Sequence, residues 1–566
     1  MQNSVLQPGK RVSENFYESD MILQHYLQTR LSARSLAYMS ERLTKLGALA
    51  AGEMNELSLT ADKNGPVLQK RNFYGETVDE IIFHPAYKRM TEIAIASDMF
   101  RVKWEPELRA RFSEERHRLG FSAGFLFAMS ESGLYCPLCM TDGVAVLIDR
   151  YCSETDKERL LPRIYSSDID YFYTGAMFLT EKAGGSDVGS NQVTATYKSE
   201  DRWLLNGEKW FCSNANADII FVLARTRPEI SGTKGLGIFL LESKLPDGSK
   251  NSMDLVRLKN KLGTRSMASG EYLLRDAEGS LVGGETDGFK IMTDMINLSR
   301  LYNSIAAIAG MRRGIIEVYQ YLTFRISFGK SALEHALIRT KFLELGSLYL
   351  GNFYCTWRAV EALDAAEDGN KTEAALLRLL TPMVKKATAG TAVYAVRESM
   401  ELMGGIGYIE DGVLPKTMRD VMVLPIWEGA GNIMVLDMLR AMLKSEGLSV
   451  MLSEMEILYS AWSAKDIENE LLWQKIISEL RALEALLEQL PNEEQDVMEA
   501  TAEIAFNRLT EFYQLYCLLR YYDEDSAVWL DTAIRFYLNR LQLVNVPQMA
   551  TAPSVEEVKS LIGWNF

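Results

Sequence analysis

The pattern of apolar residues changes twice along this chain of 566 residues, and each change marks a change of expected secondary structure. From about Asp20 to Tyr171, apolar residues recur every three to four positions, which predicts helices. From about Phe172 to Gly288 they alternate, and turn-forming residues separate the runs, which predicts strands. From residue 290 the helical spacing returns. The sequence therefore predicts a helical region, then a strand domain, then a second helical region.

Particular runs carry these expectations. Helical spacing is seen in Met21–Leu27, Ile81–Tyr87 and Gly143–Ile148. The predicted strands include Trp203–Glu208, Ile219–Ala224, Leu236–Leu241 and Glu271–Leu274. Residues 290–445 offer four long amphipathic helices, and the last 120 residues are helical with a break at Pro491. The expected domains are an arm (1–20), a helical N-domain (21–171), a middle β-domain (172–290), a four-helix bundle (291–445) and a helical C-terminal extension (446–566).

Composition is that of a soluble globular protein, with 47% hydrophobic and 24% charged residues. No apolar run approaches the roughly 20 residues of a membrane span. The six cysteines are scattered, which argues for a reducing, cytoplasmic setting, and Cys136 and Cys139 are interpreted as packing residues. With only four histidines, no metal site is expected.

The net charge of −15 is unevenly distributed. Residues 451–566 hold 20 Asp and Glu against 8 Lys and Arg, so −12 of the total lies in these residues. A surface of that sign repels a phosphate backbone, which argues against nucleic acid as a partner. Aromatic residues in the same region predict buried packing. They are Trp462, Trp473, Phe506, Tyr513, Tyr516, Tyr521, Tyr522 and Phe536.

Two segments of the strand domain carry small hydroxyl side chains next to glycines. The first, residues 179–188, reads L-T-E-K-A-G-G-S-D-V, and the second, residues 209–214, reads K-W-F-C-S-N. Thr180, Ser186 and Ser213 supply hydroxyl donors, and the glycine pair 184–185 lets the backbone approach a flat, polar-edged ring closely. Further on, residues 325–330 read R-I-S-F-G-K, residues 403–408 read M-G-G-I-G-Y, and residues 426–432 read I-W-E-G-A-G-N.

In this order, these segments resemble the signatures of the acyl-CoA dehydrogenase family. The resemblance covers about residues 75 to 445. It implies an α+β fold with a helical N-domain, a middle β-domain and a C-terminal four-helix bundle, to which this chain adds a helical extension. It also implies a homotetramer, a dimer of dimers, in which Arg325 binds the pyrophosphate of the neighbouring subunit's flavin.

The resemblance further implies FAD as the cofactor and Glu428 as the catalytic base. The implied FAD-binding residues are Met177, Phe178, Leu179, Thr180, Ser186, Phe211, Cys212, Ser213, Arg325, Phe328, Glu401, Gly404, Gly405, Ala430 and Asn432. The implied acyl-CoA-binding residues are Ser186, Asn297, Arg300, Glu428 and Gly429. A carboxylate between an acyl chain and a flavin is desolvated, which raises its pKa toward that of the α-proton it removes. A hydride then leaves the β-carbon for flavin N5.

Several details are similar to the AidB branch of the family, including T-E-K at residues 180–182 and F-H-P-A at 83–86. Two positions depart from the medium-chain enzymes: Ala336 replaces a flavin-contacting Gln, and Ala430 replaces a Thr beside the base. The predicted function is a flavin-dependent acyl-CoA dehydrogenase with an unidentified electron acceptor. The alternatives are a flavoprotein that sequesters acyl-CoA and an AidB-type DNA-associated protein. The sequence leaves the acyl chain length open.

Overall fold

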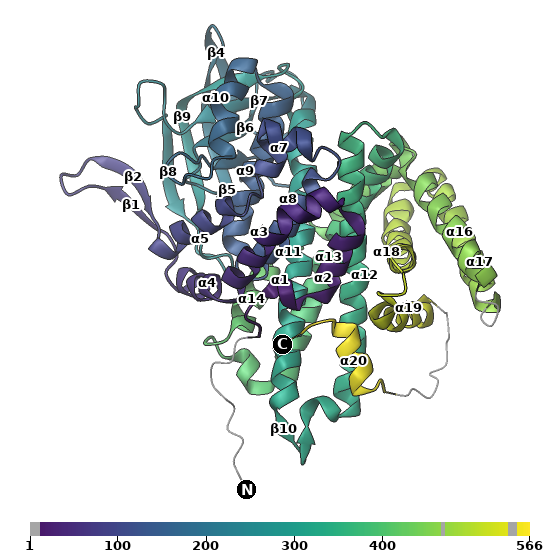
Figure 1. Ribbon diagram of the computed structural model, residues 1–566. Coiled ribbons are helices and arrows are strands. Elements are labelled where there is room, and N and C mark those ends of the chain that lie inside the picture. Colours follow the sequence, from purple (N-terminus) through teal and green to yellow (C-terminus); the bar gives the residue numbers. More distant parts are fainter. Residues whose placement is uncertain (1–11, 466–469, 542–551, 566) are drawn as a thin grey trace. The chain divides into compact units, whose positions relative to one another are not determined.

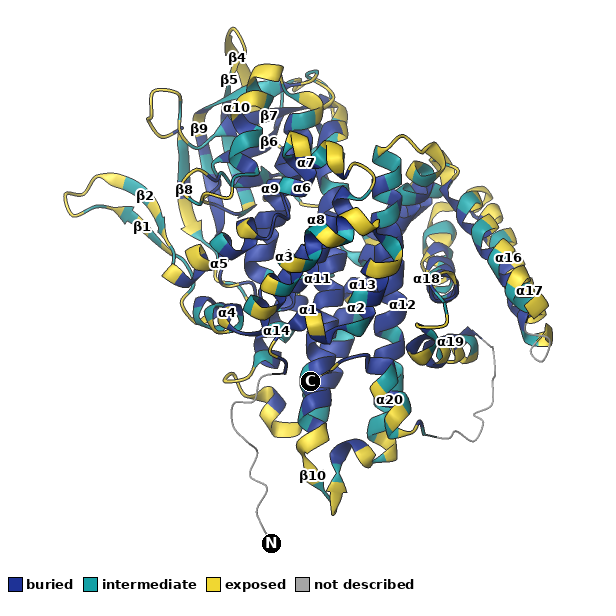
Figure 2. Ribbon diagram, in the orientation of Figure 1, coloured by how far each residue is buried: buried dark blue, intermediate teal, exposed yellow. Residues whose placement is uncertain are grey.

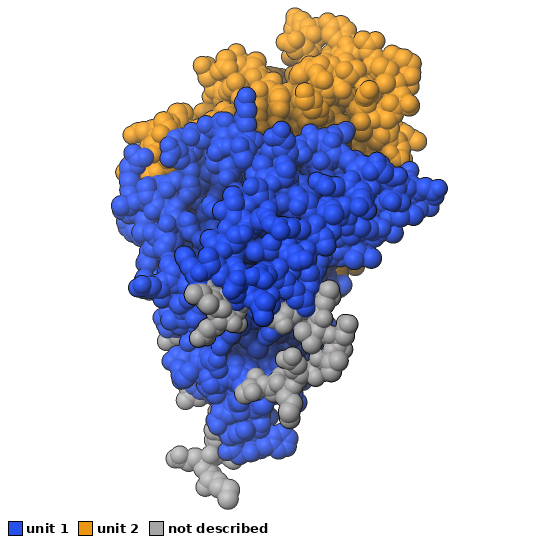
Figure 3. All heavy atoms as spheres, turned by 90° about the vertical axis from the view of Figure 1, so that its right-hand side faces the viewer, with its two compact units in different colours: residues 1–52, 113–129, 303–566 blue, residues 53–112, 130–302 orange. Residues whose placement is uncertain are grey.

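The computed structural model describes residues 12–465, 470–541 and 552–565. The chain folds into two compact units (Figure 3). Unit 1 consists of residues 1–52, 113–129 and 303–566, and unit 2 of residues 53–112 and 130–302. Both units therefore combine segments that are far apart in the sequence.

Unit 2 is built around a seven-stranded sheet (Figure 1). Its strands are β3 (Gly175–Phe178), β4 (Thr194–Ser199), β5 (Arg202–Ser213), β6 (Ile219–Arg225), β7 (Leu236–Glu242), β8 (Met253–Leu258) and β9 (Ser269–Val282). Pairings of β6 with β7, β7 with β9, β9 with β5, β5 with β4 and β4 with β6 close a ring. The inward side chains of these strands, among them Phe178, Phe239 and Leu205, form one buried core.

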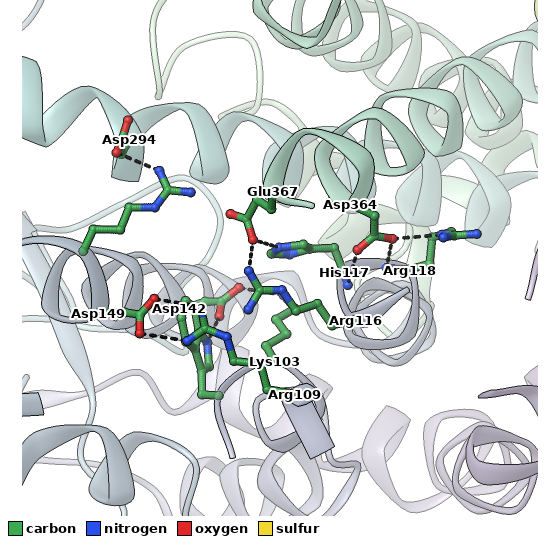
Figure 4. Close-up of polar contacts among 12 residues, drawn as sticks. Lys103, Arg109, Arg116, His117, Arg118, Asp142, Asp149, Asp294, Asp364 and Glu367 are labelled. Atoms are coloured by element: carbon green, nitrogen blue, oxygen red, sulfur yellow. Dashed lines mark hydrogen bonds and ion pairs between the residues drawn. The ribbon is translucent and has the colours of Figure 1, made fainter. Parts of the chain in front are cut away.

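Helices of unit 2 precede the sheet. They are α4 (Glu53–Lys63), α5 (Pro85–Ala96), α6 (Arg101–Trp104), α7 (Pro106–Arg111), α9 (Ser132–Tyr151) and α10 (Glu154–Ile164), with a hairpin of β1 (Val67–Arg71) and β2 (Thr77–Ile82) between α4 and α5. A fully buried ion pair joins α6 to α9, where Lys103 Nζ lies 2.6 Å from Asp142 Oδ2 (Figure 4). Trp104 Nε1 also donates to Asp142, at 2.5 Å. This carboxylate fixes the contact between two helices because its charge and hydrogen bonds are satisfied there.

Unit 1 is helical. Its segments are α1 (Phe16–Ser19), α2 (Met21–Arg30), α3 (Ala33–Ala51), α8 (Arg116–Ala128), most of α11 (Gly288–Phe324), a hairpin of β10 (Ile326–Ser327) and β11 (Lys330–Ser331), α12 (Ala336–Glu367), α13 (Lys371–Met403), α14 (Val413–Val421) and α15 (Gly431–Lys444). Figure 2 shows α11 and α12 as mostly buried. Glu367 at the end of α12 accepts hydrogen bonds from Arg116 and His117, which anchors α8 to the bundle (Figure 4).

The C-terminal extension packs on the bundle in unit 1. Its helices are α16 (Gly447–Lys465), α17 (Glu470–Gln489), α18 (Gln495–Arg520), α19 (Ala527–Leu541) and α20 (Val555–Ile562). Arg358 of α12 is 1% exposed and binds Glu373 of α13 at 2.7 Å and Glu454 of α16 at 3.1 Å. Five of the eight aromatic residues predicted to be buried are so, namely Trp473, Phe506, Tyr513, Tyr516 and Tyr521, and the other three are half-buried. Helices α16, α18, α19 and α20 of the extension thus pack on α12 or α13 of the bundle, and α17 packs on α16 and α18.

The predicted succession of helices, strands and helices is confirmed, and so is the α+β class. The predicted strands all form, in β5, β6, β7 and β9. The helical interpretation of Ile81–Tyr87 is wrong in its first part, because Ile81 and Ile82 end strand β2 and the helix begins at Pro85. The predicted arm is described only from residue 12, and part of it is the short helix α1. Within the described ranges, no helix is long and apolar enough to cross a membrane.

A buried arginine, Arg312, links the last described residues of the chain to its N-terminal segment. Arg312 of α11 binds Asp20, with Nε 2.9 Å from Oδ2, and both side chains are at most 1% exposed. The same guanidinium donates to the carbonyl oxygens of Ile562 at 2.6 Å and Gly563 at 3.1 Å. It also lies over the ring of Trp564. One charge pair therefore holds three segments of unit 1 together.

We expect Asp20→Asn to lower the free energy of unfolding by about 3–5 kcal/mol, because it leaves the buried Arg312 without its countercharge. Urea unfolding followed by tryptophan fluorescence measures this change. Glu456→Gln is the matched control, because it breaks an exposed ion pair with Arg481 in the same unit, worth at most about 1 kcal/mol. Equal effects of the two substitutions would contradict the conclusion that the ion pair of Arg312 and Asp20 holds these segments together.

Candidate active site

The two hydroxyl-bearing segments of unit 2 lie side by side, although some thirty positions separate them. The backbone N–H of Trp210 in β5 donates to the carbonyl oxygen of Thr180, at 2.9 Å. Gly184 adopts φ +159°, and its N–H closes a turn onto the carbonyl of Glu181 at 3.1 Å. Thr180 and Ser213 are half-buried and Ser186 is exposed, so their hydroxyl groups remain available to a ligand.

A buried ion pair holds this junction. Lys209 Nζ lies 2.7 Å from Glu181 Oε1, and their side chains are 0% and 5% exposed. Glu181 also accepts backbone N–H bonds from Gln192 and Val193. Burial lowers the pKa of the Lys209 ammonium, and the charge of Glu181 opposes that shift. The pair fixes the strand end that carries Thr180 to the strand that carries Ser213.

Phe211 projects from β5 with 56% of its surface exposed. The ammonium of Lys259 lies 4.3 Å from the centre of its ring and 3.7 Å from that of Trp210. Lys259 is held in turn by Glu271 at 2.6 Å, and hydrogen bonds from Arg257 and Lys259 lower the pKa of Glu271 to about 2. The result is an exposed aromatic ring with a fixed positive charge above it.

The other predicted residues of unit 2 lie at the same strand ends or on helix α11. Met177 and Leu179 are half-buried, whereas Phe178 and Cys212 are fully buried and belong to the sheet core. The Cys212 side chain is fully buried and packs in that core, and burial raises the pKa of its thiol. Asn297 and Arg300 lie one turn apart on α11, and Arg300 Nη1 donates to Asn297 Oδ1 at 3.1 Å. That bond orients the guanidinium.

In unit 1, Glu428 lies on a strained turn immediately before α15. Its φ is +58°, and that of Gly429 is +103°. A left-handed conformation costs a residue with a side chain roughly 1–2 kcal/mol, and such strain is typical of functional positions. The indole Nε1 of the neighbouring Trp427 is buried with no hydrogen-bond partner among the described residues. Ala430 is the N-cap of α15 and provides no side-chain cap, the structural consequence of having no Thr there.

Glycines at the end of α13 leave backbone accessible. Gly404 has φ +69°, and a Cβ placed on Gly404 or Gly405 would meet no atom within 4 Å. Both glycines are exposed, and so are Glu401 and Asn432. Glu401 accepts a hydrogen bond from Arg397 at 2.8 Å. A flat ligand can therefore approach this segment, η4 (Gly404–Tyr408), without displacing a side chain.

The β10–β11 hairpin presents an arginine and a phenylalanine to solvent. Phe328 is 98% exposed and has φ +49°, at the tip of the hairpin. The Arg325 side chain is exposed and makes no ion pair with any described residue. A capping box between Ser331 and Glu334 holds the base of the hairpin. Such an exposed pair on a fixed turn suits contact with a ligand or with another chain.

Three family models match the chain. The model of the AidB N-terminal domain covers residues 7–171, that of the acyl-CoA dehydrogenase middle domain residues 176–277, and that of the acyl-CoA dehydrogenase C-terminal domain residues 286–443. The chain therefore belongs to the acyl-CoA dehydrogenase family. The prediction of the family and of its AidB-like branch is confirmed.

Individual relatives of the chain support this family assignment. Acyl-CoA dehydrogenase family member 11 of Caenorhabditis elegans is 31% identical over 77% of this chain and 72% of its own length. AidB of Escherichia coli (strain K12) is 32% identical over 79% of this chain and 82% of its own length. The crystal structure of C. elegans ACDH-11 in complex with C11-CoA superposes with a TM-score of 0.87, at 27% identity, covering 97% of this chain and 95% of that one.

Three residues of the candidate site were not predicted from the sequence. Lys209 stands in a segment that was recognised, but its partner Glu181 lies 28 positions away. Lys259 follows Phe211 by 48 positions, and no motif links them. The third is Lys385 of α13, whose Nζ lies 2.5 Å from the carbonyl oxygen of Gly429.

Proposed function

We propose that the chain binds FAD and oxidises an acyl-CoA between its α and β carbons, with Glu428 as the base. The observation that carries the proposal is a carboxylate held on a strained, partly buried turn in a member of this family. Further support comes from the accessible hydroxyls at the strand ends of unit 2. The C. elegans relative was solved with C11-CoA, which favours a fatty acyl-CoA here too.

The residues present fit FAD. Thr180 and Ser213 offer hydroxyls for the edge of a flavin ring, and Phe211 offers an exposed aromatic face beside them. Gly404 and Gly405 leave room for close approach of a ligand, and Arg325 has a guanidinium free for a pyrophosphate. Bound FAD would supply the acceptor for the hydride. Asn297 and Arg300 would bind coenzyme A, and Glu428 would take the α-proton.

The proposal includes a cytoplasmic dimer of dimers. Arg325 and Phe328 project from a hairpin, and the part of unit 1 that surrounds them places no carboxylate against the guanidinium. A second chain would receive them, so that each FAD contacts two subunits. The physiological electron acceptor is a separate partner.

The purified protein is expected to be yellow, with FAD bound without a covalent link, since the proposed contacts are hydrogen bonds and ion pairs. Absorbance spectroscopy before and after denaturation measures the released cofactor. A colourless protein that takes up no FAD on reconstitution would overturn the proposed function.

Sequestration of acyl-CoA with little turnover is the second candidate, and the structure of the relative with C11-CoA is what favours it. The DNA-associated alternative is less well supported, because residues 451–566 carry a net charge of −12. Binding to phosphates is driven by counterion release, which requires a positively charged protein surface.

A further inference from the structure

A buried lysine of α13 contacts the turn that carries Glu428. Lys385 is 1% exposed, and its Nζ lies 2.5 Å from the carbonyl oxygen of Gly429. Helices α13 and α15 pack against each other, so the turn before α15 lies against the middle of α13. The donor and the acceptor are 44 positions apart in the sequence.

The neighbouring residue, Lys386, serves an ordinary structural role. Its side chain is 18% exposed and lies 3.3 Å from Glu503 of α18, and its Nζ donates to Asn507 Oδ1 at 2.7 Å. Desolvation of an ammonium costs several kcal/mol, and a helix that only had to pack would carry an apolar side chain at position 385. The contact with Gly429 therefore needs a reason beyond packing.

The turn itself supplies that reason. Glu428 and Gly429 both have positive φ values, and a left-handed residue with a side chain persists only where its surroundings hold it. On one side of Glu428, the N–H of Trp427 donates to Val423 at 3.1 Å. On the other side, Lys385 fixes the carbonyl of Gly429. The backbone of Glu428 is thus anchored on both sides.

We propose that Lys385 is a positioning residue, which holds the strained turn so that the Glu428 carboxylate keeps the orientation needed to remove the α-proton. This inference rests on the proposed function, because it assigns Lys385 to the reaction of Glu428. Lys385 itself need not touch the acyl-CoA or the FAD.

The test uses the FAD-loaded full chain and a saturated fatty acyl-CoA under anaerobic conditions. In Lys385→Met the donor is lost, and the rate of FAD reduction is expected to fall by about 10²-fold, the typical effect of a misplacement of about 1 Å. Acyl-CoA affinity and FAD content should stay close to those of the wild type. Lys386→Met, the matched control, should reduce FAD at the wild-type rate, and Lys385→Arg, which keeps a charged donor, should recover part of the lost rate.

If Lys385→Met does not fold, Lys385→Gln replaces it. The glutamine side chain is one bond shorter than that of lysine, so it does not reach the Gly429 carbonyl as Lys385 does, and its polar amide avoids placing an apolar group beside that carbonyl. A folded variant of either kind that reduces FAD at the wild-type rate, while Glu428→Gln is inactive, overturns the inference and leaves the proposed function intact. A Glu428→Gln variant as active as wild type would instead overturn the proposed function. Equal losses in Lys385→Met and Lys386→Met would also overturn the inference, because they would reflect damage to α13.

Discussion

Glu428→Gln is expected to slow the reduction of bound FAD by acyl-CoA by about 10²- to 10⁴-fold, the usual contribution of a general base. The substitution preserves the shape of the side chain and removes the proton acceptor. The loss should therefore fall on the chemical step, while acyl-CoA binds with nearly unchanged affinity. Stopped-flow absorbance of the flavin measures the rate, and a spectral titration measures the affinity.

Asp411→Asn is the control for this experiment. Asp411 is an exposed carboxylate on the loop between η4 and α14, in the same unit as Glu428. Its amide variant should react as fast as the wild type. If the Glu428→Gln variant also did so, another base would have to be found, and the assignment of Glu428 would be wrong.

Arg325→Ala is expected to weaken FAD binding by about 100-fold without unfolding the chain. Charge-assisted hydrogen bonds contribute about 1.5–3 kcal/mol each, and a guanidinium can make two to a pyrophosphate. Arg325 is exposed at the start of the β10–β11 hairpin, so its loss leaves no cavity. FAD content after gel filtration and a reconstitution titration give the affinity, and the thermal unfolding of the FAD-free protein reports on the fold.

Arg440→Ala provides the comparison for Arg325. Arg440 is an exposed arginine of α15, and its removal takes one positive charge from the same unit. FAD content should be unchanged in this variant. Equal loss of FAD in both variants would indicate a general effect of net charge and would contradict the specific role of Arg325.

The fold could be predicted largely from the runs of apolar residues and the turn-forming residues between them. The strands β6 and β7 consist almost entirely of buried apolar residues, and turn-forming residues separate them, so both were found. The hairpin of β1 and β2 was missed because its strands are half-exposed, and its last apolar residues run directly into helix α5. A window over residues 81–87 therefore mixes two periodicities.

The site could be predicted only where its residues are close in the sequence. Thr180 and Ser213 belong to recognisable segments, whereas the pairs that support them join distant positions. Lys209 binds Glu181 across the junction of two strands, and Lys385 reaches Gly429 between two helices. A lysine within an amphipathic helix is normally solvated, and nothing in the local pattern distinguishes Lys385 from Lys386. Their roles differ because Lys385 donates to the carbonyl of Gly429, whereas Lys386 binds side chains of α18.

Anaerobic mixing of the FAD-loaded wild-type protein with saturated acyl-CoAs of increasing chain length distinguishes a dehydrogenase from a sequestering protein. At least one of them is expected to bleach the flavin, and mass spectrometry is expected to detect the corresponding 2-enoyl-CoA. Tight binding of acyl-CoA with no bleaching at any chain length would contradict the dehydrogenase and establish the sequestering protein in its place.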